Sequence, residues 1–208
     1  MTYKLIIFDF DGTLADTYPW FLNVINEVAD QYQFKKIEQE NDDAIRGLSA
    51  SQVLKHLGIP LWKVPMISKH MQSLMANDID NINVFDGVND MLRTFSELGI
   101  ELGVVSSNNN QNISRVLGME NIAMIKHFQC GVSLFGKESK LKKIIRSSGC
   151  SLDEVIFIGD EVRDVESAKK IKINAGAVVW GYNNRDALEA SSPDFVFESI
   201  DDLHQKLL

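Results

Sequence analysis

Short apolar runs recur along the chain, and each of them ends in acidic residues, small polar residues or glycine. Runs with the length and composition of buried strands lie at residues 4–8, 101–105, 155–158, 176–179 and, with a weaker pattern, 195–197. The runs are continuous rather than alternating, as is typical of parallel strands that are covered on both faces. The pattern therefore predicts a parallel sheet buried between two layers.

Between these runs, apolar residues recur at the three- and four-residue spacing of amphipathic helices. The last such pattern begins at Ser199, where Asp202 three residues later forms an acidic variant of a capping box. Helices are predicted over residues 88–98, around 141–149, over 162–171 and from 199 to 207. Because strands and helices alternate from residue 86 onward, we predict an α/β domain.

Residues 16–85 have a different texture, with several helical patterns and no convincing strand. A crossover between parallel strands needs only about a dozen residues plus short loops, and this segment is far longer. We therefore predict that residues 16–85 form a small all-helical cap domain. The α/β core then consists of two pieces of sequence, residues 1–15 and 86–208.

Composition excludes several classes of protein. The chain has 208 residues, with 29 acidic against 21 basic side chains and a net charge of −8, which argues against a nucleic-acid or anionic-membrane partner. No stretch approaches the roughly 20 apolar residues that span a bilayer. The apolar run before the first acids is too short for a signal peptide, and Cys130 and Cys150 form no CxxC pair. We expect reduced thiols in a cytoplasmic protein.

The strongest chemical signal directly follows the first predicted strand, where Asp9 and Asp11 flank Phe10 and precede Gly12 and Thr13. Ligands of open α/β sheets bind beyond the carboxyl ends of strands, and acids two residues apart on extended backbone point to the same side. Such a pair repels itself unless a cation lies between the acids or one acid is protonated. The motif favours Mg²⁺ and an acid free for proton transfer. The alternative is a solvated Asp-Gly turn.

Other polar residues follow later predicted elements. Ser106 follows the run at 101–105, Lys137 lies before the helical pattern around 141–149, and Asp160 and Asp164 follow the run at 155–158. Singly, each has an ordinary structural interpretation as a capping hydroxyl, a solvated loop cation or a first-turn helix acid. Their joint occurrence in this order is far more specific.

In this order the residues resemble the sequence motifs of the haloacid dehalogenase superfamily, and residues 178–182 and 192–196 look like its phosphoglycolate phosphatase-like branch. The resemblance covers nearly the whole chain and is weakest over residues 30–80. It implies a Rossmann-like parallel sheet with a helical cap inserted after the first motif. That branch often has Lys-Pro at the lysine motif. Proline is absent here, which leaves Lys140 as a competitor of Lys137.

The resemblance also implies roles for these residues. Asp9 would be the nucleophile that forms an aspartyl-phosphate, and Asp11 would be the general acid and base. Ser106 and Lys137 would bind the phosphoryl group. Mg²⁺ would be held by the Asp9 carboxylate, the Asp11 backbone carbonyl and Asp160. Of the neighbouring acids, Asp164 is the stronger further candidate near the metal and Glu161 the weaker.

The expected enzyme is a Mg²⁺-dependent phosphatase for a small phosphorylated metabolite, such as a phosphoglycolate-like ester, a sugar phosphate or a nucleotide. The candidates for substrate contact are Thr13, Ser107, Asn108 and Arg46. Arg46 belongs to a cap segment similar to the family's, and the equal alternative is that it is an ordinary surface arginine. A sugar phosphomutase would keep every motif, whereas Asp11 disfavours a hydrolytic dehalogenase. The oligomeric state, monomer or dimer, is left open.

Overall fold

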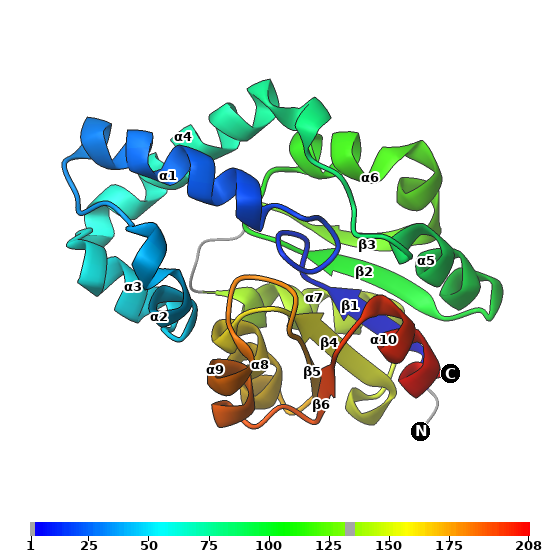
Figure 1. Ribbon diagram of the computed structural model, residues 1–208. Helices are drawn as coiled ribbons and strands as arrows, with labels where there is room; N and C mark the ends of the chain where they lie inside the picture. Colours follow the sequence, from blue (N-terminus) through cyan, green and yellow to red (C-terminus); the bar gives the residue numbers. More distant parts are fainter. Residues whose placement is uncertain (1–2, 132–135) are drawn as a thin grey trace.

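The computed structural model describes residues 3–131 and 136–208, and these residues contain a six-stranded sheet with the order β3-β2-β1-β4-β5-β6 (Figure 1). Every strand pairs in parallel with its neighbours. The strands are β1 (Leu5–Phe8), β2 (Glu101–Val105), β3 (Ile125–Gln129), β4 (Val155–Gly159), β5 (Asn174–Val178) and β6 (Phe195–Phe197). Because β1 lies between β2 and β4, the segments that follow these three strands leave the sheet side by side.

Helices cover both faces of the sheet and make three layers (Figure 1). One face carries α5 (Val88–Glu97), α6 (Asn110–Met124) and α10 (Ile200–Leu207); the other carries α7 (Lys137–Ser148), α8 (Val162–Ile171) and α9 (Arg185–Ala190). Along β1, Ile6 and Phe8 pack into the first layer of helices and Leu5 and Ile7 into the second. This burial on both faces explains the continuous apolar runs and confirms the predicted α/β fold.

The helices of the expected cap lie to one side of the sheet, beyond the end of β1 (Figure 1). They are α1 (Tyr18–Tyr32), α2 (Asp42–Arg46), α3 (Ala50–Leu57) and α4 (Val64–Asn77), with short 3₁₀ turns at Gln39–Asn41, Leu61–Lys63 and Ile79–Asn81. They enclose a hydrophobic cluster separate from the two clusters of the sheet. Ala15 forms a β-bridge with Val84, so the two connections to the core lie together. The domain limits at residues 16 and 85 stay a prediction.

The elements of the described core that were not predicted include the kinked helix α6, the edge strand β3 and the short helix α9. In α6, Gly118 has a φ of +74°, which interrupts the helix and its apolar spacing. In β3, the sequence IKHFQ has only its first residue fully buried, so it lacks the apolar run of the inner strands. Among residues 3–131 and 136–208 no helix has the length and apolar character needed to cross a membrane.

Candidate active site

Asp9 directly extends β1, and its backbone N–H donates a hydrogen bond to the carbonyl of Ile158 at 2.8 Å. The next residue, Phe10, is fully buried in the core, so the acids on either side of it are directed away from that core. Gly12 then turns the chain with a φ of +73°, and a Cβ atom at this position would collide with the carboxylate of Asp160. The Asp-Gly turn and the close approach of the β4 loop therefore both require glycine here.

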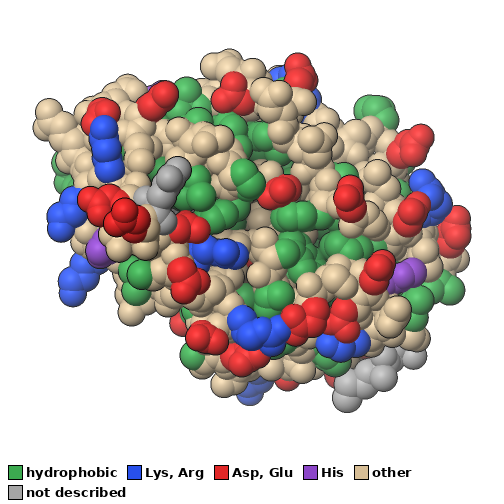
Figure 2. Space-filling view, viewed as in Figure 1, with side chains coloured by type: hydrophobic (Ala, Val, Ile, Leu, Met, Phe, Trp, Pro, Cys, Tyr) green, Lys and Arg blue, Asp and Glu red, His purple; other side chains and the backbone are tan. Residues whose placement is uncertain are grey.

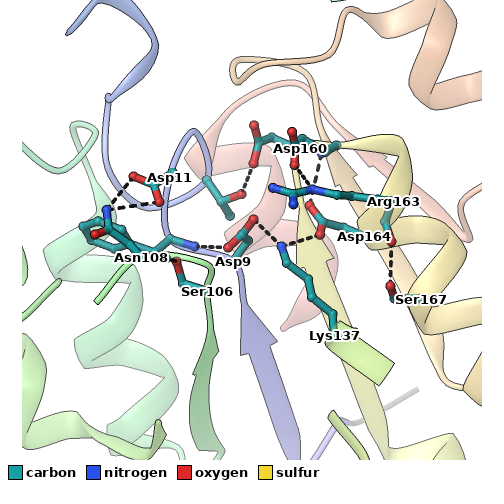
Figure 3. A network of polar contacts seen from close by, with 12 residues as sticks. Asp9, Asp11, Ser106, Asn108, Lys137, Asp160, Arg163, Asp164 and Ser167 are labelled. Atoms are coloured by element: carbon teal, nitrogen blue, oxygen red, sulfur yellow. Dashed lines mark hydrogen bonds and ion pairs between the residues drawn. The ribbon is translucent and has the colours of Figure 1, made fainter. Parts of the chain in front are cut away.

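Lys137 is the first residue of α7, and its side chain is buried against two carboxylates (Figure 3). Its Nζ lies 2.5 Å from Oδ2 of Asp9 and 2.5 Å from Oδ1 of Asp164. Burial acts to lower the pKa of Lys137, but the negative charges of Asp164 and Asp9 outweigh it and raise the pKa. Lys137 is thus held as a cation beside Asp9. Lys140, one turn further along α7, is partly exposed.

Asp9, Asp160 and Asp164 form a buried triad in which one carboxylate oxygen of each lies within 4.8 Å of the others. Burial is the main cause that raises the pKa of Asp9 to about 7 and the pKa of Asp160 well above its usual range. For Asp160, the charges of neighbouring acids add to this effect. A hard divalent cation takes carboxylate oxygens as ligands and would relieve the repulsion between them. The donor set of the triad therefore fits such a metal.

The Asp160 carboxylate is oriented by hydrogen bonds to both of its oxygens. The Thr13 hydroxyl donates to Oδ1 at 2.7 Å, and the backbone N–H of Tyr182 donates to Oδ2 at 2.8 Å. Thr13 is itself 1% exposed. Thr13, expected to contact the substrate, therefore contacts the carboxylate triad instead. It is not among the described residues that line the cavity between the cap helices and the strands.

Both carboxylate oxygens of Asp164 accept hydrogen bonds from other groups of the protein. Its Oδ1 accepts from Lys137, and its Oδ2 accepts from the backbone N–H of Glu161 at 3.2 Å, which caps helix α8. The Glu161 carboxylate forms an ion pair with Arg163. Asp164 therefore belongs to the triad while Glu161 faces Arg163.

Asp11 lies apart from the triad and contacts Asn108 (Figure 3). Burial raises the pKa of Asp11 to about 6, and the hydrogen bond from Asn108 opposes this rise. The backbone N–H of Asn108 in turn donates to the hydroxyl oxygen of Ser106 at 3.0 Å. Ser106 is fully buried just after β2, and its backbone continues the ladder to Gln129. The segments after β1 and β2 are thus joined at the site.

Arg46, the last residue of α2, contacts the loop that follows β5. Its guanidinium donates to the backbone carbonyls of Gly181 at 2.7 Å and Tyr182 at 3.3 Å, and it lies 5.1 Å from the ring centre of Tyr18. The side-chain amide of Asn183 donates to the Arg46 carbonyl at 2.7 Å. The structure therefore places Arg46 at the edge of the site, where it also holds the core loop after β5.

A cavity of about 690 Å³ lies between the cap helices and the carboxyl ends of the strands. Asp11, Ser107, Asn108 and Arg46, all expected site residues, line it. Ser107 also accepts a hydrogen bond at its backbone carbonyl from the cap residue Gln72, at 2.9 Å. The structure thus places these residues where a bound molecule would contact both the helices of residues 16–85 and the segments after the strands.

Two residues of the site were missed by sequence reasoning. Arg163 lines the cavity, and the charges of Glu161, Asp164 and Asp9 raise its pKa although burial acts to lower it. Tyr182 also lines the cavity; its backbone N–H donates to the Asp160 carboxylate, and its hydroxyl lies 3.2 Å from that of Thr17. Arg163 carried a usable signal, because it lies one residue before Asp164 in a motif already recognised.

Comparisons with known proteins show the family of the chain. A family model described as haloacid dehalogenase-like hydrolase matches residues 6–178. A phosphoglycolate phosphatase of Synechococcus elongatus is 31% identical over 203 residues, which are 97% of this chain and 96% of that protein. A pyrophosphatase of Oceanobacillus iheyensis is 22% identical and covers 98% of this chain and 96% of its own length.

Solved structures share the fold. A hydrolase from Pseudomonas syringae superposes with a TM-score of 0.79 at 21% identity and covers 100% of this chain and 98% of its own. A haloacid dehalogenase-like family hydrolase from Streptococcus pneumoniae has a TM-score of 0.80 at 16% identity, with 99% of each chain covered.

Proposed function

Since the chain belongs to the haloacid dehalogenase-like hydrolase family and is a hydrolase that acts on phosphate esters, we propose that it is a Mg²⁺-dependent phosphatase for a small phosphate monoester. The observation that carries this proposal is the contact of the Lys137 ammonium with Asp9 at the edge of a buried carboxylate triad. A carboxylate nucleophile that attacks an anionic phosphate needs fixed positive charge beside it. Lys137 supplies that charge from within the protein.

Asp9 is the proposed nucleophile. One of its carboxylate oxygens bonds to phosphorus while the bond from phosphorus to the ester oxygen breaks, which leaves an aspartyl-phosphate. Asp11 donates its proton to the departing alcohol. A water molecule then gives a proton to Asp11 and attacks phosphorus, which releases inorganic phosphate and restores Asp9. The raised pKa of Asp11, about 6, suits a group that both gives and takes a proton.

Asp9, Asp160 and the backbone carbonyl of Asp11 are the proposed Mg²⁺ ligands, with Asp164 beside them. The bound metal would neutralise charge on the phosphoryl oxygens. Ser106 would donate a hydrogen bond to the phosphoryl group, and its burial at the end of β2 excludes bulk water from that contact. Thr13 holds Asp160 in place through its hydroxyl.

For the substrate, we propose a small phosphorylated metabolite, in keeping with the phosphoglycolate and pyrophosphate named for the relatives. Phosphoglycolate-like esters, sugar phosphates and nucleotides are the classes to compare. A sugar phosphomutase is the second candidate, because it would use the same nucleophile and acid. Measuring released phosphate against isomerised product separates the two. A cytoplasmic location completes the proposal.

The test uses p-nitrophenyl phosphate and the whole chain. We expect hydrolysis that requires Mg²⁺, stops with EDTA and is abolished in Asp9→Asn. Asp153→Asn is the control, since Asp153 is an exposed acid outside the site, and it should keep full activity. Hydrolysis that survives both EDTA and Asp9→Asn would contradict the proposed mechanism.

A further inference from the structure

The cavity beside Asp11 has a strongly apolar wall on the cap side. Side chains from α1, α3, α4 and the segment after α2 line it, among them Phe21, Leu48, Val53, Leu54, Met71 and Met75. Figure 2 shows hydrophobic side chains at the surface between the cap helices and the sheet domain. Pockets of about 300–1,000 Å³ hold small organic ligands in proteins, and the 690 Å³ of this cavity lies well within that range.

Three polar residues of the cavity lining follow the strands of the sheet, and others, among them Ser68 and Gln72, come from α4. Asp11, Ser107 and Asn108 are these three, and Asp11 lies two residues after the proposed nucleophile Asp9, on the same loop (Figure 3). A phosphate ester bound with its phosphoryl group at Asp9 would therefore extend its alcohol past Asp11 and into the apolar part of the cavity. The alcohol is the group that leaves in the proposed reaction.

Three basic side chains belong to the described lining of the cavity, and two of them contact other groups of the protein. The Arg46 guanidinium donates to the carbonyls of Gly181 and Tyr182. Arg163 forms an ion pair with Glu161. Lys69 is exposed to solvent on α4. A carboxylate or second phosphate on the alcohol would lose its water among the mostly apolar side chains of this part of the cavity, which is costly.

We propose that the alcohol released by this enzyme is apolar, an alkyl or aryl group of about six to twelve carbon atoms. The proposal rests on the phosphatase function above and specifies the substrate of that same site. Its physical cause is the removal of apolar surface from water on both the alcohol and the cap. Each methylene buried in this way contributes up to about a fourfold gain in affinity.

The test is a series of linear alkyl phosphates, from ethyl through butyl and hexyl to octyl phosphate, each assayed below its micelle concentration with Mg²⁺. We expect kcat/KM to rise about two- to fourfold per methylene and phosphoglycolate to rank below butyl phosphate. If kcat/KM does not change with chain length, or if phosphoglycolate is the best substrate, the proposal of an apolar alcohol is wrong, while the proposed phosphatase function is unaffected. Absence of hydrolysis with every ester, p-nitrophenyl phosphate included, counts instead against the proposed function.

A matched pair of cap variants locates the effect. Leu54 and Leu74 are both half-buried and both pack on the cap cluster, but of the two only Leu54 lines the cavity. In Leu54→Gln the ratio of kcat/KM for octyl over ethyl phosphate should fall about fivefold or more, and Leu74→Gln should leave the ratio unchanged. Equal ratios in the two variants contradict the proposal.

A second variant guards against loss of folding. Leu54→Phe keeps the wall apolar and reduces the space, so kcat/KM should stop rising at a shorter alkyl chain than in the unaltered protein. Melting temperatures of all three variants establish that the compared proteins are folded. A chain-length limit that does not move in Leu54→Phe means that the alcohol does not enter this cavity.

Discussion

The side-chain amide of Asn108 lies 3.1 Å and 3.3 Å from the two carboxylate oxygens of Asp11. This contact joins the loop after β2 to the loop after β1. It also favours the ionised form of Asp11, whose pKa burial raises to about 6. Burial and the hydrogen bond from Asn108 are the two largest causes acting on the pKa of the proposed general acid, and they oppose each other, so removal of the hydrogen bond has a defined direction.

Asn108→Ala should move the pH profile of kcat/KM toward alkaline pH. Asp11 must be protonated to serve the leaving alcohol, so the rate falls as pH rises through its pKa. Without the amide donor the ionised form of Asp11 is less stable, so its pKa rises. The decrease of kcat/KM on the alkaline side of the profile should therefore occur about half to one pH unit higher.

Asn112→Ala is the control for this profile. Asn112 donates to Asn108 at 3.1 Å and belongs to the same polar network, but Asn108 lies between it and Asp11. If the alkaline decrease of kcat/KM stays at the same pH in Asn108→Ala, or shifts equally in both variants, the role of the Asn108–Asp11 contact is contradicted.

Lys137→Met should lower kcat by about a hundredfold or more, because one fixed positive charge beside the proposed nucleophile is lost. Lys140→Met on the same helix should change kcat by less than about threefold, since Lys140 is partly exposed. Steady-state kinetics with p-nitrophenyl phosphate, on variants whose melting curves show a folded protein, measure both. The reverse ranking would assign the lysine role to Lys140.

Arg46→Ala should change substrate preference more than reactivity toward p-nitrophenyl phosphate. Arg46 lines the cavity from the cap and binds the carbonyl of Gly181, so its removal alters the cap wall while Asp9 and Lys137 stay in place. The measurement is kcat/KM over a panel of phosphoglycolate, sugar phosphates, nucleoside monophosphates and pyrophosphate. An equal loss with every substrate would instead identify Arg46 as a contact that only holds the cap.

When the metal is removed, the free energy of unfolding should depend on pH because the Asp9 carboxyl gains or loses its proton. The pKa of Asp9 is about 7 in the folded protein and lies near 4 in an unfolded chain. The folded state therefore binds the proton more tightly, and this contribution to stability is present at low pH and lost as pH rises through 7. From pH 5.5 to pH 8 the free energy of unfolding should fall by about 2 kcal/mol from this group.

Urea unfolding with EDTA at the two pH values measures this loss. In Asp9→Asn the contribution of Asp9 is absent, so the variant should lose about 2 kcal/mol less than the unaltered chain over the same interval. Mg²⁺ added at pH 8 should stabilise the unaltered chain, because a cation favours the ionised carboxylates of the triad. Identical pH dependence in the two proteins would contradict the raised pKa of Asp9.

The layered α/β fold could be predicted from the amino-acid pattern alone, because strands buried on both faces must be apolar throughout and their helices must be amphipathic. The same pattern also placed Asp9, Asp11 and Ser106 at strand ends, since the carboxyl ends of parallel strands share one edge of the sheet. It did not predict β3, a half-exposed edge strand with no need of a continuous apolar run.

Which side chains contact one another depends on how the helices and strands pack in three dimensions. Lys137 reaches Asp9 across 128 positions of sequence, and Thr13 reaches Asp160 across 147, and no local pattern records such a contact. The apolar cavity is likewise formed by helices that are separate in sequence and pack around a shared space. Periodicity reports which face of an element is buried, whereas the direction of a side chain toward a distant partner depends on how the elements pack.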